Sequence, residues 1–184
     1  MLRILKQIAA IKIVTEAPPC PDDADLDAIG IEVHRLIAAR YGRSLAIRHV
    51  DAGSCNGCEL EIHALNNPYY DVERFGVHFV ASPRHADALL VTGPVSRHME
   101  AALRRTWRAV PGPKFVIAAG TCACDGGEFG VSYASRGAVE NVVSVDVRIP
   151  GCPPTPLDLL TGLLLAIRTD PRRGIAPPAS REPS

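Results

Sequence analysis

Six cysteines are the residues of this 184-residue sequence whose type and spacing point most directly to chemistry. They are Cys20, Cys55, Cys58, Cys122, Cys124 and Cys152. An even number is typical of a disulfide framework in a secreted protein, but Lys12 interrupts the apolar stretch that a secretory signal would need. We therefore expect a cytoplasmic protein, in which cysteines serve metal binding or catalysis more often than disulfides.

The positions of these cysteines along the chain predict that they meet. Cys55, Cys122 and Cys152 each follow, within a few residues, an apolar run of strand length. In an open parallel sheet the carboxyl ends of all strands lie along one edge, and ligands bind there. We expect three loops distant in sequence to bring these thiols, together with Cys58, to one site.

The loops are rich in glycine, which lets the backbone approach a ligand closely. Four thiolates can hold an iron–sulfur cluster or a structural zinc ion, and reduced structural thiols are a third possibility. Zinc ribbons usually carry two CxxC pairs, whereas here Cys55 and Cys58 form one pair and Cys122 and Cys152 are single. Cys124 and Cys20 are interpreted as non-ligands.

Strands that alternate with helices must position these loops. Strand patterns occupy residues 45–50, 76–80, 88–92, 115–119 and 142–149. Helices are predicted at residues 29–41, 59–66, 97–110 and 156–168, the third of them capped by Ser96. The alternation is typical of an α/β fold with a mostly parallel sheet.

The ends of the chain differ from this pattern. Residues 1–14 have the spacing of an amphipathic helix that would dock on a partner or on a membrane surface, and a proline-rich linker follows. We expect an N-terminal extension over residues 1–43, an iron–sulfur α/β domain over 44–169 and a disordered tail over 170–184.

Composition excludes several classes of function. Twenty Lys and Arg balance twenty Asp and Glu, so no excess positive charge exists to bind nucleic acid. No apolar stretch approaches the ~20 residues that cross a bilayer. No GxxxxGK[ST] or GxGxxG motif is present, so a bound nucleotide is not expected.

Three charged residues are further candidates. Glu59 and Glu61 follow Cys58 and would suit proton transfer at a partner interface, although acidic residues are also ordinary at a helix N-terminus. Arg84 would face the cluster or a partner, where a positive charge favours the reduced cluster; otherwise it is a surface arginine.

Several ordered motifs resemble the small subunit of membrane-bound, energy-converting nickel–iron hydrogenases of the formate hydrogenlyase type. They are residues 51–62, 81–87, 91–95, 120–127 and 149–156. The 20 kDa subunit of respiratory complex I is related, but it carries two adjacent cysteines where Asn56 and Gly57 separate Cys55 from Cys58.

The resemblance implies a flavodoxin-like fold and one 4Fe–4S cluster on Cys55, Cys58, Cys122 and Cys152. It implies an oxidoreductase subunit that relays electrons between a large catalytic subunit and a ferredoxin-like subunit with two 4Fe–4S clusters. It also implies membrane-arm subunits as neighbours, and a peripheral position on the cytoplasmic face of the inner membrane. The alternatives are the corresponding 20 kDa subunit of a complex I-like NADH/quinone or ferredoxin oxidoreductase and a zinc-stabilised interaction module.

Overall fold

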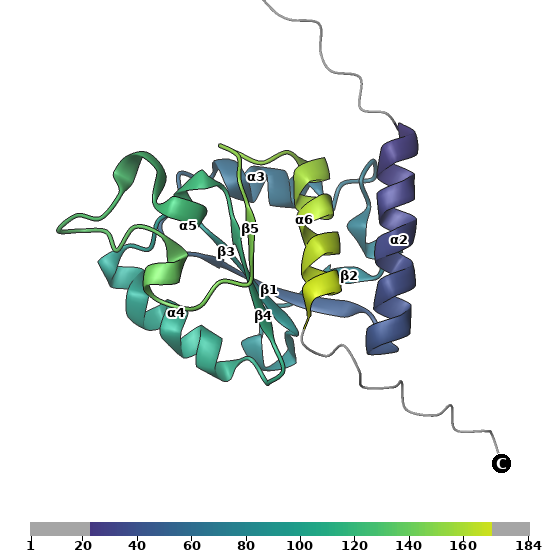
Figure 1. Ribbon diagram of the computed structural model, residues 1–184, viewed down its shortest axis with the longest axis horizontal. Helices are drawn as coiled ribbons and strands as arrows, with labels where there is room; N and C mark the ends of the chain where they lie inside the picture. Colours follow the sequence, from purple (N-terminus) through teal and green to yellow (C-terminus); the bar gives the residue numbers. More distant parts are fainter. Residues whose placement is uncertain (1–22, 171–184) are drawn as a thin grey trace, which may run out of the picture.

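The computed structural model describes residues 23–170, which form one parallel sheet between two layers of helices (Figure 1). The strands are β1 (Leu45–Asp51), β2 (Val77–Phe79), β3 (Ala88–Thr92), β4 (Phe115–Ala119) and β5 (Val147–Ile149). The α-helices are α2 (Asp23–Tyr41), α3 (Gly57–Ala64), α4 (Arg97–Ala109), α5 (Thr121–Asp125) and α6 (Pro156–Thr169). Short 3₁₀ turns are η1 (Val72–Phe75), η2 (Pro83–His85), η3 (Gly127–Phe129) and η4 (Val139–Asn141).

The strand order is β2-β1-β3-β4-β5, and every neighbouring pair is parallel. This is the order of flavodoxin-like doubly wound sheets, in which ligands bind at the carboxyl ends of the strands. The predicted α/β fold is therefore confirmed.

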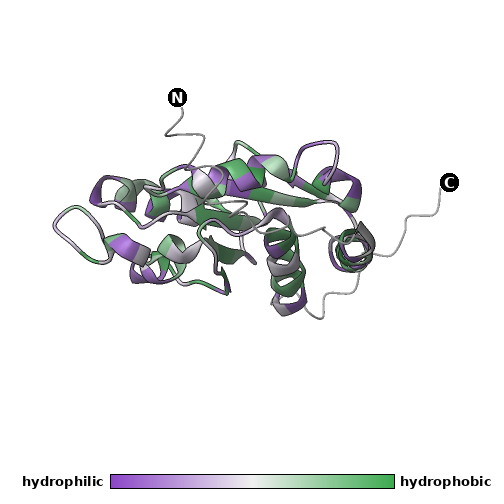
Figure 2. Cartoon of the chain, turned by 90° about the horizontal axis from the view of Figure 1, so that it is seen from above, coloured by the Kyte–Doolittle hydropathy of each residue, from purple (hydrophilic) through white to green (hydrophobic). Residues whose placement is uncertain are grey.

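The sheet is buried on both faces, which explains why the central strands are continuously apolar. Every residue of β3 and of β4 is buried. Seen from the perpendicular direction, the apolar colour runs along the strands in the middle of the molecule (Figure 2). Alternate residues of one strand therefore enter two different cores.

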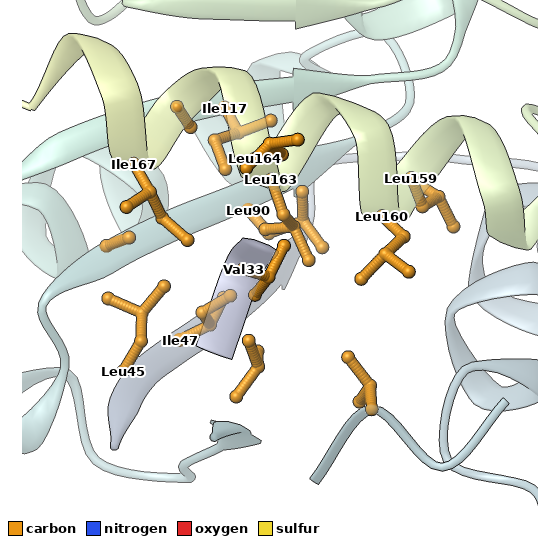
Figure 3. Close-up of a cluster of buried hydrophobic side chains, with 14 of the residues drawn as sticks. Val33, Leu45, Ile47, Leu90, Ile117, Leu159, Leu160, Leu163, Leu164 and Ile167 are labelled. Atoms are coloured by element: carbon orange, nitrogen blue, oxygen red, sulfur yellow. The ribbon is translucent and has the colours of Figure 1, made fainter. Parts of the chain in front are cut away.

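Helices α2 and α6 cover one face of the sheet, and α4 and α5 cover the other (Figure 1). On the first face, Leu45, Ile47, Leu90 and Ile117 of the sheet pack with a row of leucines from α6 (Figure 3). Val33 of α2 enters the same cluster and is fully buried. Helix α2 thus packs on the α/β core.

Side-chain caps fix where two helices begin. The Ser96 hydroxyl accepts a hydrogen bond from the Met99 amide at the start of α4, as predicted. Helix α6 begins with a capping box between Thr155 and Asp158, which was not predicted.

The predicted strand over residues 142–149 is wrong for residues 142–146, since β5 contains only Val147–Ile149. Val142 and Val143 are both buried in the core beneath α4, whereas consecutive strand residues point to opposite faces. The Asp146 carboxylate accepts a hydrogen bond from the Val116 amide at 2.8 Å, so this side chain takes a place that a backbone carbonyl would fill in a longer strand.

The predicted amphipathic helix at residues 1–14, its linker and most of the tail at 170–184 lie outside the described residues.

Candidate metal centre

The four predicted cysteines line one small cavity at the carboxyl edge of the sheet. Cys55 and Cys58 come from the β1–α3 loop and the first turn of α3, Cys122 from α5, and Cys152 from the β5–α6 loop. The cavity measures about 100 Å³. Most of its other lining residues are small: Ser54, Gly57, Gly93, Thr121, Gly151 and Pro153. Thiols separated by almost a hundred positions of sequence thus share one site.

Glycine is required where the backbone runs closest to these sulfur atoms. Gly120, directly after β4, has a φ of +91°, and a Cβ atom there would lie 2.5 Å from the Cys58 Sγ. Asn56, directly after Cys55, adopts the left-handed conformation with a φ of 75°, which Asn tolerates better than most residues. These conformations form a cradle in which the backbone makes room for the sulfur atoms.

The thiols influence one another electrostatically. Burial raises the pKa of the Cys58 thiol to about 11, and the charges of Glu59, Cys55, Cys122 and Cys152 act in the same direction. Burial likewise raises the pKa of Cys122, with Cys152 and Cys55 the next causes. Without a bound cation the site holds these two thiols protonated at neutral pH, so binding of a metal group as thiolates releases protons.

The four thiols do not form a ready-made metal site. Within residues 23–170, no group of three or more His, Cys, Asp or Glu side chains is arranged to hold a single ion. A zinc ion places all four sulfur atoms about 2.3 Å from one point. Four thiols that line one cavity provide the ligand number of a zinc ion and of a 4Fe–4S cluster alike.

Cys124 lies on α5 close to Cys122, but its thiol does not line the cavity and forms hydrogen bonds with backbone carbonyls instead. Its thiol donates to the carbonyls of Ala118 and Ile149, at 3.5 and 3.6 Å, at the ends of β4 and β5. Burial raises the pKa of this thiol. The remaining cysteine, Cys20, lies outside the described residues.

Glu59 takes part in a buried hydrogen-bond network behind Cys58. Its carboxylate accepts hydrogen bonds from the Ser54 hydroxyl, at 2.7 Å, and from the Thr92 hydroxyl. His49 Nε2 lies 3.0 Å from the Thr92 Oγ1 and 3.7 Å from the carboxylate. The network ties the Cys55–Cys58 loop to the ends of β1 and β3.

Ser54, Thr92 and His49 were not predicted as site residues. The signal available for Ser54 and Thr92 was their place at or beyond a strand end, within the motifs at residues 51–62 and 91–95. His49 gave no signal, because its contact with Thr92 depends on which strands are neighbours in the sheet.

The other two predicted candidates lie apart from this network. Glu61 is partly exposed on α3. Arg84 lies in η2, which precedes β3, and it lines a separate cavity of about 500 Å³ together with Arg43, Asp87 and Pro113. That cavity is at the amino edge of the sheet, so Arg84 does not face the cysteines.

The chain belongs to the family described as the 20 kDa subunit of NADH ubiquinone oxidoreductase, whose model matches residues 55–166. The matched segment begins at Cys55 and includes the other three site cysteines. Fold, site and family together define the chain as a subunit of an oxidoreductase complex.

Three relatives of the chain are subunits of different oxidoreductases. The chain is 49% identical over 154 residues to formate hydrogenlyase subunit 7 of Escherichia coli K12, covering 80% of this chain and 60% of that protein. It is 45% identical over 143 residues to a probable membrane-bound hydrogenase subunit of Pyrococcus furiosus, covering 77% of this chain and 86% of that one. It is 44% identical over 125 residues to an NADH-quinone oxidoreductase subunit of Desulfovibrio desulfuricans, with 67% of each covered.

A solved structure shares the fold. A chain of the membrane-bound sulfane sulfur reductase, an archaeal respiratory membrane complex, matches with a TM-score of 0.63 and 30% identity, over 78% of this chain and 77% of that one. Within residues 23–170, no helix is both long and apolar enough to span a membrane.

Proposed function

We propose that the chain binds one 4Fe–4S cluster on Cys55, Cys58, Cys122 and Cys152 and relays electrons within a membrane-associated nickel–iron hydrogenase complex. The observation that carries this proposal is the single cavity lined by all four thiols. Four cysteine thiolates are the usual ligand set of such a cluster. The family match and the relatives named as hydrogenase subunits favour a cluster over the zinc-stabilised module.

In this proposal the protein holds the cluster, which when bound supplies one-electron redox chemistry. Cys58 and Cys122 are partly buried, whereas Cys55 and Cys152 are exposed, so this chain would cover one side of the cluster and a partner subunit the other. Such burial and hydrogen bonding tune the potential of a cluster. Glu59 stabilises the loop that presents Cys55 and Cys58, while proton transfer by Glu59 or Glu61 stays a prediction.

The partners follow from the same proposal. A large catalytic subunit exchanges electrons with the cluster, a ferredoxin-like subunit with two 4Fe–4S clusters lies on its other side, and membrane-arm subunits hold the assembly on the cytoplasmic face of the inner membrane. This is supported by relatives named as formate hydrogenlyase and membrane-bound hydrogenase subunits. Arg84, at the opposite edge of the sheet, is a candidate for contact with one of these neighbours.

The 20 kDa subunit of a complex I-like oxidoreductase is the second candidate. The family name and the 44% identity to an NADH-quinone oxidoreductase subunit favour it. The nickel content of the purified complex separates the two candidates, because a hydrogenase partner binds nickel and a quinone-reducing one does not.

The relay is tested by adding hydrogen to the oxidised, anaerobic complex and recording low-temperature EPR spectra. We expect a signal of the reduced cluster, and we expect Cys58→Ser to abolish it while Cys124→Ser retains it. A complex whose cluster stays oxidised under hydrogen, although nickel is present, would contradict the relay.

A further inference from the structure

Large apolar side chains are gathered on one exposed loop, made of residues 128–137. The side chains of Phe129, Val131 and Tyr133 are 60%, 73% and 93% exposed. Among residues 23–170, the other exposed large hydrophobic residues are single ones on separate elements: Ile31, Leu60, Tyr69 and Leu165. Clustered exposure of this kind marks an interaction site, whereas scattered exposure is normal.

The loop is a defined structure. Val131 and Arg136 form an antiparallel bridge, and the Ser132 amide donates to the Ser135 carbonyl at 2.9 Å. The Ser132 hydroxyl accepts from the amides of Ala134 and Ser135, at 3.3 and 3.1 Å. These bonds shape a tight turn that holds Tyr133 at its tip.

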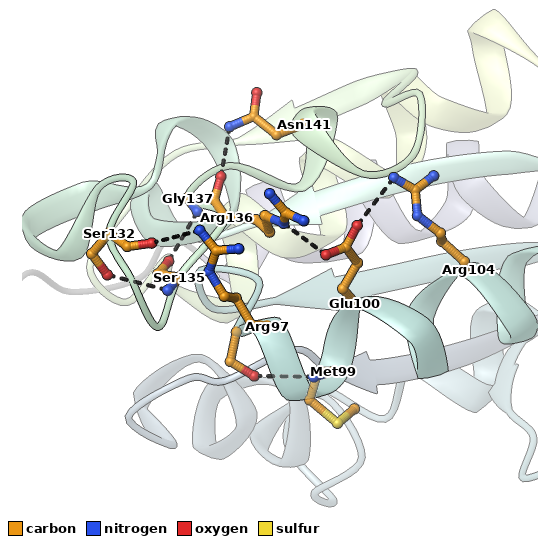
Figure 4. Close-up of polar contacts among 10 residues, drawn as sticks. Arg97, Met99, Glu100, Arg104, Ser132, Ser135, Arg136, Gly137 and Asn141 are labelled. Atoms are coloured by element: carbon orange, nitrogen blue, oxygen red, sulfur yellow. Dashed lines mark hydrogen bonds and ion pairs between the residues drawn. The ribbon is translucent and has the colours of Figure 1, made fainter.

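Polar contacts fasten the loop to the first turns of α4 (Figure 4). Arg136 Nε lies 2.7 Å from the Glu100 carboxylate, which also pairs with Arg104 at 3.3 Å. Arg97 donates from its guanidinium to the Ser132 carbonyl at 3.3 Å. The loop is thus held in place without burying its apolar side chains, and such pre-organisation lowers the entropy lost on binding.

The two glycines directly before this loop pack against Cys122. The Gly126 amide donates to the Cys122 carbonyl at 3.0 Å, and a Cβ atom on Gly127 would lie 2.8 Å from the Cys122 Sγ. In Figure 1 the loop projects on the left, beyond α5, which carries Cys122. The base of the loop therefore adjoins Cys122, one of the four thiols of the cavity.

We infer that the 128–137 loop docks into an apolar pocket on the large catalytic subunit that exchanges electrons with the cysteine site. The inference rests on the proposed electron-transfer function, which requires such a subunit beside this cavity. A lipid surface is the alternative occupant, and cross-linking from the tip of the loop distinguishes the two. Tyrosine and phenylalanine supply large contact areas at little entropic cost and are enriched in interface hot spots.

The inference is tested on the whole complex, purified through an affinity tag on this chain. With Phe129→Ser and Tyr133→Ser combined, we expect the retained large subunit to fall about tenfold or more, the size of a hot-spot loss. Ile31→Ser is the matched control, because Ile31 is 65% exposed on α2 and far from the loop in the chain, and it should leave retention unchanged. Iron content is measured in every preparation.

A photo-cross-linking amino acid at position 133 identifies the neighbour directly. We expect a cross-link to the large subunit, and none from the same group at position 31. Full retention of the large subunit by the double variant, or cross-links only to lipid or to a second copy of this chain, would overturn the inference. Because retention and cross-linking are scored separately from iron, a wild-type chain without a cluster would refute the proposed function and still leave the docking result readable.

Discussion

At the scale of single residues, the environment of Glu59 indicates a structural role for this acidic side chain next to the cysteine motif. Glu59 is only 7% exposed and accepts hydrogen bonds from two hydroxyls. Loss of either hydroxyl would leave the buried carboxylate short of a hydrogen bond, and an unpaired buried polar group lowers the free energy of unfolding by about 1–3 kcal/mol. The position of Glu59 thus fixes the loop that presents Cys55 and Cys58.

His49, at the edge of this network, makes stability depend on pH. Burial lowers its pKa below the ordinary value, although Glu59 and Asp51 act in the opposite direction. The folded protein therefore disfavours the charged ring. The contribution of this residue is fully present above the unfolded pKa of about 6.5 and is lost as pH falls through the lower folded pKa.

We expect His49→Gln to flatten this part of the pH dependence. Urea unfolding of the wild type should show a lower free energy of unfolding at pH 5 than at pH 7.5, and the variant should lose less over the same interval. His98→Gln, an exposed position on α4, is the control. Equal slopes for wild type and His49→Gln would refute this assignment.

Gly120 is a second residue whose replacement is informative. Gly120→Ala would place a Cβ 2.5 Å from the Cys58 Sγ at a φ of +91°, so we expect iron content to fall severalfold and unfolding free energy to drop by more than about 1 kcal/mol. Gly112→Ala meets no atom within 4 Å and should retain both properties. Normal iron content in Gly120→Ala would show that the cradle is not needed.

At the scale of elements, continuous apolar runs were the most predictive signal. The buried runs at residues 88–92 and 115–119 are β3 and β4 with their predicted bounds. The alternating run at 142–149 gave a wrong prediction for residues 142–146, because valines on a loop can fill a core as well as valines on a strand. Helix α5 was missed because its five residues are too short to show helical periodicity.

The capping box of α6 gives a test at this scale. Thr155→Ala removes the hydroxyl that accepts from the Asp158 amide at 3.2 Å and the bond that this hydroxyl donates to the Asp158 carboxylate at 2.7 Å. We expect the free energy of unfolding to fall by about 1 kcal/mol. Thr161→Ala, an exposed change within the same helix, should stay within about 0.5 kcal/mol. Equal losses would mean that the cap contributes nothing specific.

At the scale of the whole molecule, strand order and the convergence of distant loops determine the site. The order β2-β1-β3-β4-β5 is not written in any local pattern, since it depends on how helices cross the sheet. The common edge was nevertheless predictable, because all parallel strands end on the same side. The contacts of Glu59 with Thr92 and of Arg136 with Glu100 were not, because they depend on neighbours chosen by that packing.

Helix α2 precedes the predicted domain start at residue 44, yet its packing predicts that it stabilises the core. Ile37 is 3% exposed and Ile31 is 65% exposed on the same helix. Ile37→Ala should lower the free energy of unfolding by about 2–5 kcal/mol, and Ile31→Ala by no more than about 0.5 kcal/mol. Urea denaturation followed by circular dichroism measures both. Similar values for the two variants would place α2 outside the cooperative unit.

The central claim is that four thiols from three distant loops hold one iron–sulfur cluster. The most direct measurement is iron, acid-labile sulfide and zinc content of the anaerobically purified complex and of its Cys58→Ser and Cys152→Ser variants, with iron of neighbouring subunits assigned by EPR. The account predicts about four irons and four sulfides at this site in the wild type, absent from both variants. Zinc without iron at this site, or a cluster signal that survives both substitutions, would contradict it.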